Sequence, residues 1–164
     1  MSLEQAELRE TVLAQLAGHT VCTLATQNED GAHAASLMYA HDGLELYWMS
    51  DSKSQHSRNL AADGRSAITV ARQFDDFAAI QGLQMKGHAA RITDDAAEKR
   101  AMKLMAGRYP FLDAFRAGKL ARALAAAALY RFRPRCVTLI DNTRAFGFKQ
   151  NLEIPIGSGE NDTA

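Results

Sequence analysis

The chain has 164 residues, 47% of them hydrophobic, and its 19 basic residues balance its 19 acidic residues to a net charge of zero. This length is typical of one compact domain, and the neutral balance excludes a global field that would attract nucleic acid or an anionic membrane. Cations are concentrated between Lys99 and Arg135, where they alternate with apolar positions as on the solvated face of amphipathic helices. We therefore expect no nucleic-acid partner.

The sequence also indicates no membrane segment and no metal site. Acids occur at the start, MSLEQAELRE, where a secretory signal would carry cations, and the longest apolar run, around 123–130, is too short to span a bilayer. Cys22 and Cys136 each lie in an apolar run without a second ligand at metal spacing. We expect a cytoplasmic protein with two reduced core cysteines, no membrane partner and no metal.

A helix is predicted to open the chain. Leu8, Val12 and Leu16 repeat at helical spacing, and Ser2 with Gln5 resembles a capping box before them. The pattern predicts an amphipathic helix whose apolar side packs on the rest of the domain.

Strand-like segments follow the helix. Two such runs, 21–26 and 32–40, are separated by Asp30-Gly31, and Asp42-Gly43 precedes a third. Asp-Gly pairs between such runs are typical of hairpin turns. The pattern predicts a three-stranded meander that ends near Met49.

Residues 44–60, LELYWMSDSKSQHSRNL, carry hydroxyl and cationic side chains between a strand and a helix. Alternation through residues 44–49 indicates a half-buried strand, and Ser54 is a candidate N-cap. Free amides, a helix dipole and nearby cations together suit a phosphate ester. The alternative is a plain helix cap followed by a solvated face. The polar residues of this junction are Ser50, Ser52, Lys53, Ser54, His56 and Arg58.

The rest of the chain predicts further strands and two helical regions. Gly82 and Gly87, inside an expected strand, indicate bulges or a close approach. Six or seven short strands, with an N-terminal helix and helices between later strands, predict an antiparallel β-barrel of the α+β class. The expected segments are strands 66–72 and 81–92, a helix from Asp94 to Arg108, a helical region 111–128, and strands 129–133, 137–141 and 144–150.

The order of several short motifs resembles the pyridoxamine 5'-phosphate oxidase-like, FMN-binding split-barrel superfamily, over roughly Leu8 to Gln150. The ordered set is more specific than any single piece, and its end resembles a short bacterial branch of that superfamily. The motifs are TLAT (23–26) before NEDG, ASLMYA (35–40), SDSKSQHSRNL (50–60), GLQMKGHA (82–89), RYPF (108–111) and DNTRAFGFK (141–149).

The resemblance implies a split-barrel domain over residues 1–150 that forms a homodimer with FMN at the subunit interface. The phosphate would be held at the exit of the third strand, Arg58 would be a weaker contact, and Asn59 would brace the loop. Residues 151–164, which end in a tail poor in apolar residues, are expected to be disordered. The implied phosphate residues are Ser50, Lys53, Ser54 and His56.

The resemblance also implies contacts to the flavin ring. Ser36, Leu37 and Met38 would run beside the isoalloxazine, and Gln84 would reach it from the fifth strand. Asn142, Phe146 and Lys149 would come from the second subunit. Purely structural roles remain as alternatives: Gln84 as an outward strand residue, Trp48 as core, Asn142 as a turn residue with positive φ and Phe146 as core.

The implied function is an FMN-dependent oxidoreductase acting on an unidentified small molecule, with the hydride chemistry supplied by the flavin. Two alternatives remain, a flavin- or haem-binding stress or sensor module without turnover and a deazaflavin-dependent reductase. The chain has Phe146 where the vitamin B6 oxidases carry a histidine two residues after the arginine, here Arg144. A phenyl ring cannot make the polar contact of an imidazole, so we do not expect vitamin B6 oxidation.

Overall fold

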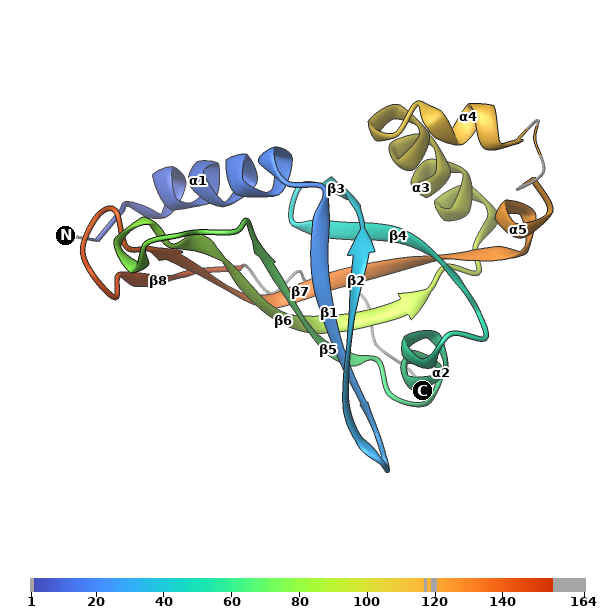
Figure 1. Ribbon diagram of the computed structural model, residues 1–164, viewed down its shortest axis with the longest axis horizontal. Helices are drawn as coiled ribbons and strands as arrows, with labels where there is room; N and C mark the ends of the chain where they lie inside the picture. The colour runs from blue at the N-terminus through green and yellow to red at the C-terminus, as the bar shows by residue number, and fades with distance from the viewer. Residues whose placement is uncertain (1, 117, 119–120, 155–164) are drawn as a thin grey trace.

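The computed structural model describes residues 2–116, 118 and 121–154. An antiparallel sheet curls into a split barrel, α1 covers one part of it, and α3, α4 and α5 lie together over another (Figure 1). The elements are α1 (Gln5–Gly18), β1 (Val21–Asn28), β2 (Gly31–Met38), β3 (Ala40–Asp42), β4 (Glu45–Asp51), α2 (Gln55–Ala62), β5 (Arg65–Ala71), a 3-10 turn η1 (Phe77–Ala79), β6 (Gln81–Arg91), α3 (Asp95–Arg108), α4 (Phe111–Arg116), α5 (Ala121–Ala126), β7 (Ala127–Asp141) and β8 (Lys149–Leu152).

The strand order is β2-β1-β5-β6-β7-β4-β3, with β8 added to β7. The first and last strands of this path, β2 and β3, are separated in the chain only by Tyr39. The expected meander is therefore wrong, because the run 32–40 divides at Tyr39 and its two parts join opposite edges of the sheet. The α+β antiparallel barrel itself is confirmed.

Tyr39 is anchored at this crossing by hydrogen bonds. Its side chain is fully buried, its hydroxyl donates to the carbonyl oxygen of Leu16 at 2.8 Å, and its backbone N–H donates to Thr20. The hydroxyl of Tyr109 donates to the carbonyl oxygen of Tyr39. Burial raises the pKa of Tyr39, so its hydroxyl stays protonated and keeps donating.

β4 is buried on both faces, which differs from the half-buried strand that its alternation predicts. Leu46 and Trp48 belong to the barrel core with Leu8, while Tyr47 packs in a second cluster with Met105. The second face is covered because α3 and α4 fold back over it. Trp48 is fully buried, as its interpretation as core predicts.

Gly87 marks a β-bulge between two long strands, as expected. Lys86 pairs with Cys136 and Gly87 with Pro134, so β7 contributes one extra residue. A Cβ atom at Gly87 would lie 2.1 Å from the carbonyl oxygen of Arg133. The bulge accommodates Pro134, and the two strands expected at 129–133 and 137–141 are therefore one continuous β7.

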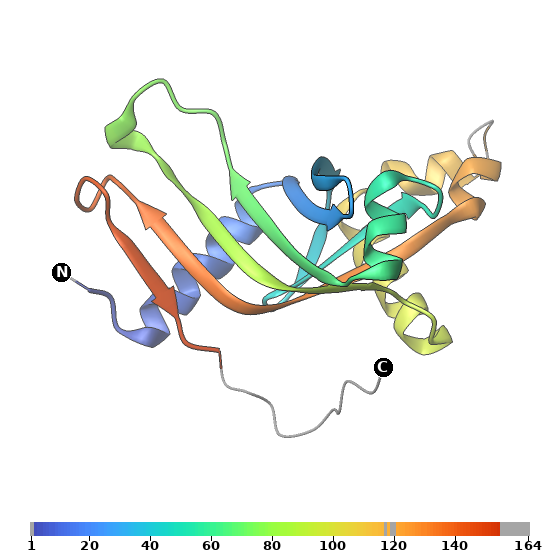
Figure 2. The same cartoon turned by 90° about the horizontal axis from the view of Figure 1, so that it is seen from below.

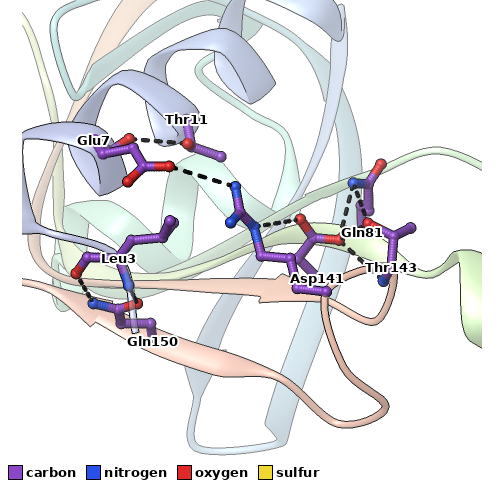
Figure 3. Close-up of polar contacts among 8 residues, drawn as sticks. Leu3, Glu7, Thr11, Gln81, Asp141, Thr143 and Gln150 are labelled. Carbon is purple, nitrogen blue, oxygen red and sulfur yellow. Dashed lines mark hydrogen bonds and ion pairs between the residues drawn. The ribbon is translucent and has the colours of Figure 1, made fainter. Parts of the chain in front are cut away.

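The N-terminal segment is held against the β7–β8 hairpin (Figure 3). The side chain of Gln150 accepts a hydrogen bond from the Leu3 N–H and donates to the Leu3 carbonyl, each at 2.7 Å. Gln5 accepts a hydrogen bond from the Glu153 N–H, so the expected capping box is wrong and Glu4 begins the helix without a side-chain cap. Arg144 contacts Asp141 and Glu7 across this seam.

The last described strand, β8, runs two residues past the expected domain boundary at Gln150, and Leu152 is buried. Residues 155–164 of the expected tail lie outside the described residues. Both cysteines are free. Cys22 is buried, and burial raises the pKa of its thiol to about 12, whereas Cys136 is only half-buried and is not core.

Candidate functional site

The turn from β4 to α2 has the geometry of a capped helix start. Ser54 is the N-cap residue, with φ −63° and ψ 156°, and its Oγ accepts a hydrogen bond from the Ser57 N–H at 3.4 Å. The helix start predicted near Ser54 is confirmed. The free N–H groups of α2 point back toward the end of β4, where Ser50 lies.

Ser50, Ser54 and His56 form what we call the hydroxyl–imidazole cluster. His56 Nε2 lies 2.8 Å from Ser50 Oγ and 3.0 Å from Ser54 Oγ. Ser54 Oγ also donates to Ser57 Oγ at 2.8 Å. Hydroxyl rotors can turn to donate to an anion, and a protonated imidazole adds a charged donor. The chemistry of this donor set fits a phosphate group.

His33 extends the cluster from β2. Its ring stacks on that of His56 with 6.3 Å between centroids and 15° between planes. Burial and the neighbouring His33 ring both lower the pKa of His56, so its imidazole is neutral at pH 7 without an anion. His33 was not among the predicted phosphate residues, because an isolated histidine in an alanine-rich strand gives no signal of what lies across the fold.

Lys53 supplies an exposed cation at the tip of the turn. Its backbone N–H donates to Asp51 Oδ1 at 2.8 Å, and its carbonyl oxygen accepts from Arg58 Nη1. The second guanidinium nitrogen of Arg58 donates to Gln55. Arg58 therefore fastens the loop, while the Lys53 side chain stays in solvent with its charge available to a ligand.

Asn59 braces the junction from beneath, as expected. Its buried side chain donates from Nδ2 to Thr26 Oγ1 at 3.0 Å and accepts from Gln55 Nε2 at 2.7 Å. Because Thr26 lies on β1, this bond fixes the first turns of α2 against the barrel.

A cavity of about 470 Å³ adjoins the cluster, between the barrel and α3, α4 and α5. Ser36, Leu37 and Met38 line it, together with Ser50. Among the described strands β2 pairs only with β1, so alternate backbone groups along its other edge are not used by this sheet. The structure thus brings the predicted ring strand and one predicted phosphate residue to the same cavity.

Gln84 lies away from this cavity. It is exposed on the outer face of β6, and pairing places it in one row with Ser36, Thr23 and Thr69. Three strand spacings, roughly 14 Å, separate it from Ser36 along that row.

The β7–β8 hairpin, whose loop contains Asn142 and whose strand β8 begins at Lys149, lies at the end of the molecule opposite α3, α4 and α5 (Figures 1 and 2). Asn142 Nδ2 donates to the Phe77 carbonyl oxygen at 2.6 Å, and its Oδ1 accepts from the Gly147 N–H at 3.0 Å. It is a loop-fastening residue, but its φ is not positive. Phe146 is 80% exposed, so the alternative that it is core is wrong.

The described residues include neither a metal-binding cluster nor a membrane-spanning helix. Within residues 2–116, 118 and 121–154, no three His, Cys, Asp or Glu side chains gather as a metal ion would require. None of the helices described is both long enough and apolar enough to cross a bilayer.

The curled antiparallel sheet and its covering helices define a split β-barrel of the α+β class. The chain belongs to the pyridoxamine 5'-phosphate oxidase family, whose sequence pattern matches residues 8–141. It is 30% identical over 139 residues to YhbP of Salmonella paratyphi A, a UPF0306 protein, covering 82% of this chain and 85% of the relative.

Solved structures share the fold at lower identity. A FAD-binding protein from Mesorhizobium loti matches with a TM-score of 0.62 and 17% identity, covering 78% of this chain and 90% of that one. The haem storage protein HutZ from Vibrio cholerae matches with a TM-score of 0.64 and 15% identity, with the same coverage of 78% and 90%. Proteins of this fold therefore include both a flavin binder and a haem protein.

Proposed function

We propose that this chain is a cytoplasmic FMN-binding flavoprotein, an oxidoreductase acting on a small molecule. The observation that carries the proposal is the hydroxyl–imidazole cluster at the start of α2, where Ser50, Ser54 and His56 meet within hydrogen-bonding distance. A dianionic phosphate ester needs several donors and charge compensation when it leaves water. The cluster, the α2 N–H groups and Lys53 supply both.

The predicted site residues would contact two different parts of FMN, its phosphate and its ring. Ser50, Lys53, Ser54 and His56 would hold the phosphate, with His33 behind His56. Backbone groups that the sheet leaves free along Ser36, Leu37 and Met38, at alternate residues of the edge strand, would bond the polar edge of the ring. When bound, FMN supplies hydride transfer, and the protein supplies position and exclusion of water. This division is supported by the cavity that both residue sets line.

Gln84, Asn142 and Lys149 would join the site only from a second copy of the chain. Along β7, Ala128 pairs with Ser50 and Ile140 pairs with Lys149. The strand between these two pairs covers roughly 40 Å at about 3.3 Å per residue. A single copy therefore keeps Lys149 far from the cluster, so the predicted contact of Lys149 with FMN requires a second copy, as in a homodimer with FMN at its interface.

The direct experiment purifies the full chain and records its absorbance between about 350 and 500 nm, then titrates it with FMN. A bound flavin with micromolar or tighter affinity is expected. A colourless protein that does not bind added FMN at micromolar concentration would overturn the proposal.

The homodimer is tested by mixing two variants, His56→Ala and Lys149→Ala, each with weakened FMN binding. If each site uses His56 of one chain and Lys149 of the other, random heterodimers carry one intact site, and about a quarter of all sites regain wild-type affinity. No recovery after exchange of subunits would contradict a shared site.

A second candidate is binding without turnover, of flavin or haem, and the haem storage protein of the same fold is the observation that favours it. Bound FMN that neither NADH nor NADPH reduces, together with no oxidase activity, would support it over the enzyme. Titration with haem and competition between FMN and a deazaflavin separate the remaining cofactors.

A further inference from the structure

The cavity under α3, α4 and α5 has a wall that phosphate binding does not explain. Its apolar lining comes from strands and helices distant in the sequence and includes three methionines, three leucines and two phenylalanines. Among these apolar residues are Met38, Met49, Met105, Phe111, Phe115 and Leu124. Methionine adapts its shape to irregular ligands, and aromatic rings favour stacked or edge-on contacts with another ring.

The rings in this wall are already arranged against one another. Phe111 and Phe115 meet edge to face at 5.5 Å between centroids, and Tyr109 lies 5.8 Å from Phe111. The hydroxyl of Tyr109 is occupied by carbonyl oxygens of Thr20 and Tyr39, so this residue presents its ring rather than a polar group. Phe111 is 45% exposed and Met38 44% exposed, which leaves apolar surface within reach of a ligand.

Few polar residues line the cavity. They are Ser36, Ser50 and Asp51, and among the described lining residues Asp51 is the only one with a formal charge at neutral pH. No cation is among the lining residues that the structure describes, so an anionic ligand would gain nothing from them and would face the Asp51 carboxylate. A neutral ring with one hydroxyl or amino group would match this lining.

We infer that this cavity binds an uncharged, ring-bearing small molecule with a single hydrogen-bonding group directed at Asp51. Its volume of about 470 Å³ lies within the usual range for small-molecule sites, roughly 300 to 1,000 Å³. Resting on the proposed function, the same inference names the class of substrate, because Ser36, Leu37 and Met38, which would lie beside the flavin ring, also line this cavity.

The test titrates the full chain, labelled with ¹³C at its methionine methyl groups, with 2-naphthol in the absence of FMN. The methyl signals of Met38, Met49 and Met105 are expected to shift together and to saturate. Met85, which lies in the barrel core, is the internal control and should not move. 2-Naphthalenesulfonate, of similar shape but anionic, is expected to bind at least about tenfold more weakly.

Two substitutions on α5 form a matched pair. Ala123 lines the cavity and Ala125 does not, although both are exposed on the same short helix. Ala123→Trp should weaken 2-naphthol binding at least about tenfold, and Ala125→Trp should change it less than about twofold.

The inference is overturned if no methyl signal moves up to about 1 mM 2-naphthol, if Met85 shifts as much as the lining methionines, or if both tryptophan variants behave alike. Because the titration contains no FMN, failure of FMN binding would remove the proposed function and leave this result intact. FMN binding with unmoved methionine signals would remove the cavity assignment alone.

Discussion

Ser50 Oγ lies 2.8 Å from His56 Nε2, although one residue is near the end of β4 and the other is in the first turn of α2. Both side chains are nearly buried, each 9% exposed. The turn between them is fastened by Asp51 and Arg58, so the pair is held by the fold before any ligand arrives. Preorganised donors of this kind avoid the ordering cost of a flexible anion site.

The pKa of His56 predicts a pH dependence of stability. Burial first, and the neighbouring His33 second, lower the pKa of His56 below its ordinary value of 6.5. On acidification, the His56 imidazole is therefore protonated in the unfolded chain before it is protonated in the folded chain. The free energy of unfolding thus rises with pH between the folded pKa and about 6.5, and this stability is lost as the pH falls through that range. Urea unfolding at about pH 8 and about pH 5 should show a smaller acid loss for His56→Gln than for the wild type.

The same titration can be followed by NMR of the His56 ring protons. Its midpoint is expected below 6.5 in the free protein and should rise when FMN binds, because a phosphate favours the imidazolium. A free-protein midpoint at or above 6.5 would contradict the burial argument.

Thr26→Val should destabilise the fold by removing the acceptor of the buried Asn59 amide. An unsatisfied buried donor costs roughly 1–3 kcal/mol. Thr69→Val, on an exposed face of β5, is the matched control and should change the free energy of unfolding by less than about 0.5 kcal/mol. Equal urea midpoints for the two variants would show that the Asn59–Thr26 bond does not hold α2.

Gly87→Ala and Gly107→Ala should change stability in opposite directions. A Cβ atom at Gly87 would meet backbone atoms of Arg133 and Pro134, whereas at Gly107, in α3, nothing lies within 4 Å. The first change should cost about 1–3 kcal/mol or more, and the second should stabilise by up to about 1 kcal/mol. Thermal and urea unfolding measure both, and a stable Gly87→Ala protein would mean that the bulge is not tightly packed.

Asp141 predicts an acid-dependent loss of stability at the opposite end of the barrel. Burial alone would raise its pKa, but hydrogen bonds from Thr143, Gln81 and Arg144 together lower the pKa below the ordinary 3.8. The carboxylate therefore stabilises the fold above about pH 4, and this contribution is lost as the pH falls through the folded pKa. Asp141→Asn should be less stable than the wild type at pH 7, and the difference should shrink at about pH 2. A difference that is independent of pH would contradict the assignment.

Local signals in the sequence predicted much of the fold, because their causes are local. Gly31 and Gly43 adopt positive φ in the turns where Asp-Gly pairs were expected, and Asp94 caps α3 through a bond from the Ala97 N–H. The division at Tyr39 was not predictable in this way. It depends on which edge of the curled sheet each half of the run joins, and no residue near Tyr39 encodes that choice.

The candidate site shows the same limit. Ser54 as N-cap and Ser50 at the strand end follow from adjacent residues, so the start of α2 was predictable. His33 reaches His56 only because β2 and α2 meet in the folded barrel. Met49 faces a second core only because α3 and α4 return over β4, which a pattern of alternation cannot reveal.

The central claim is that the turn between β4 and α2 binds the phosphate of FMN, and comparison of FMN with riboflavin tests it most directly. In the double variant Lys53→Ala/His56→Ala, FMN should bind on the order of 100-fold more weakly, about 3 kcal/mol, because two charge-assisted bonds are lost. Riboflavin, which lacks the phosphate, should change less than about threefold. His41→Ala/Lys99→Ala removes the same residue types outside the cluster and should alter neither ligand. Equal weakening of FMN and riboflavin in the first variant would contradict the account, because the turn would then support the fold without contacting the phosphate.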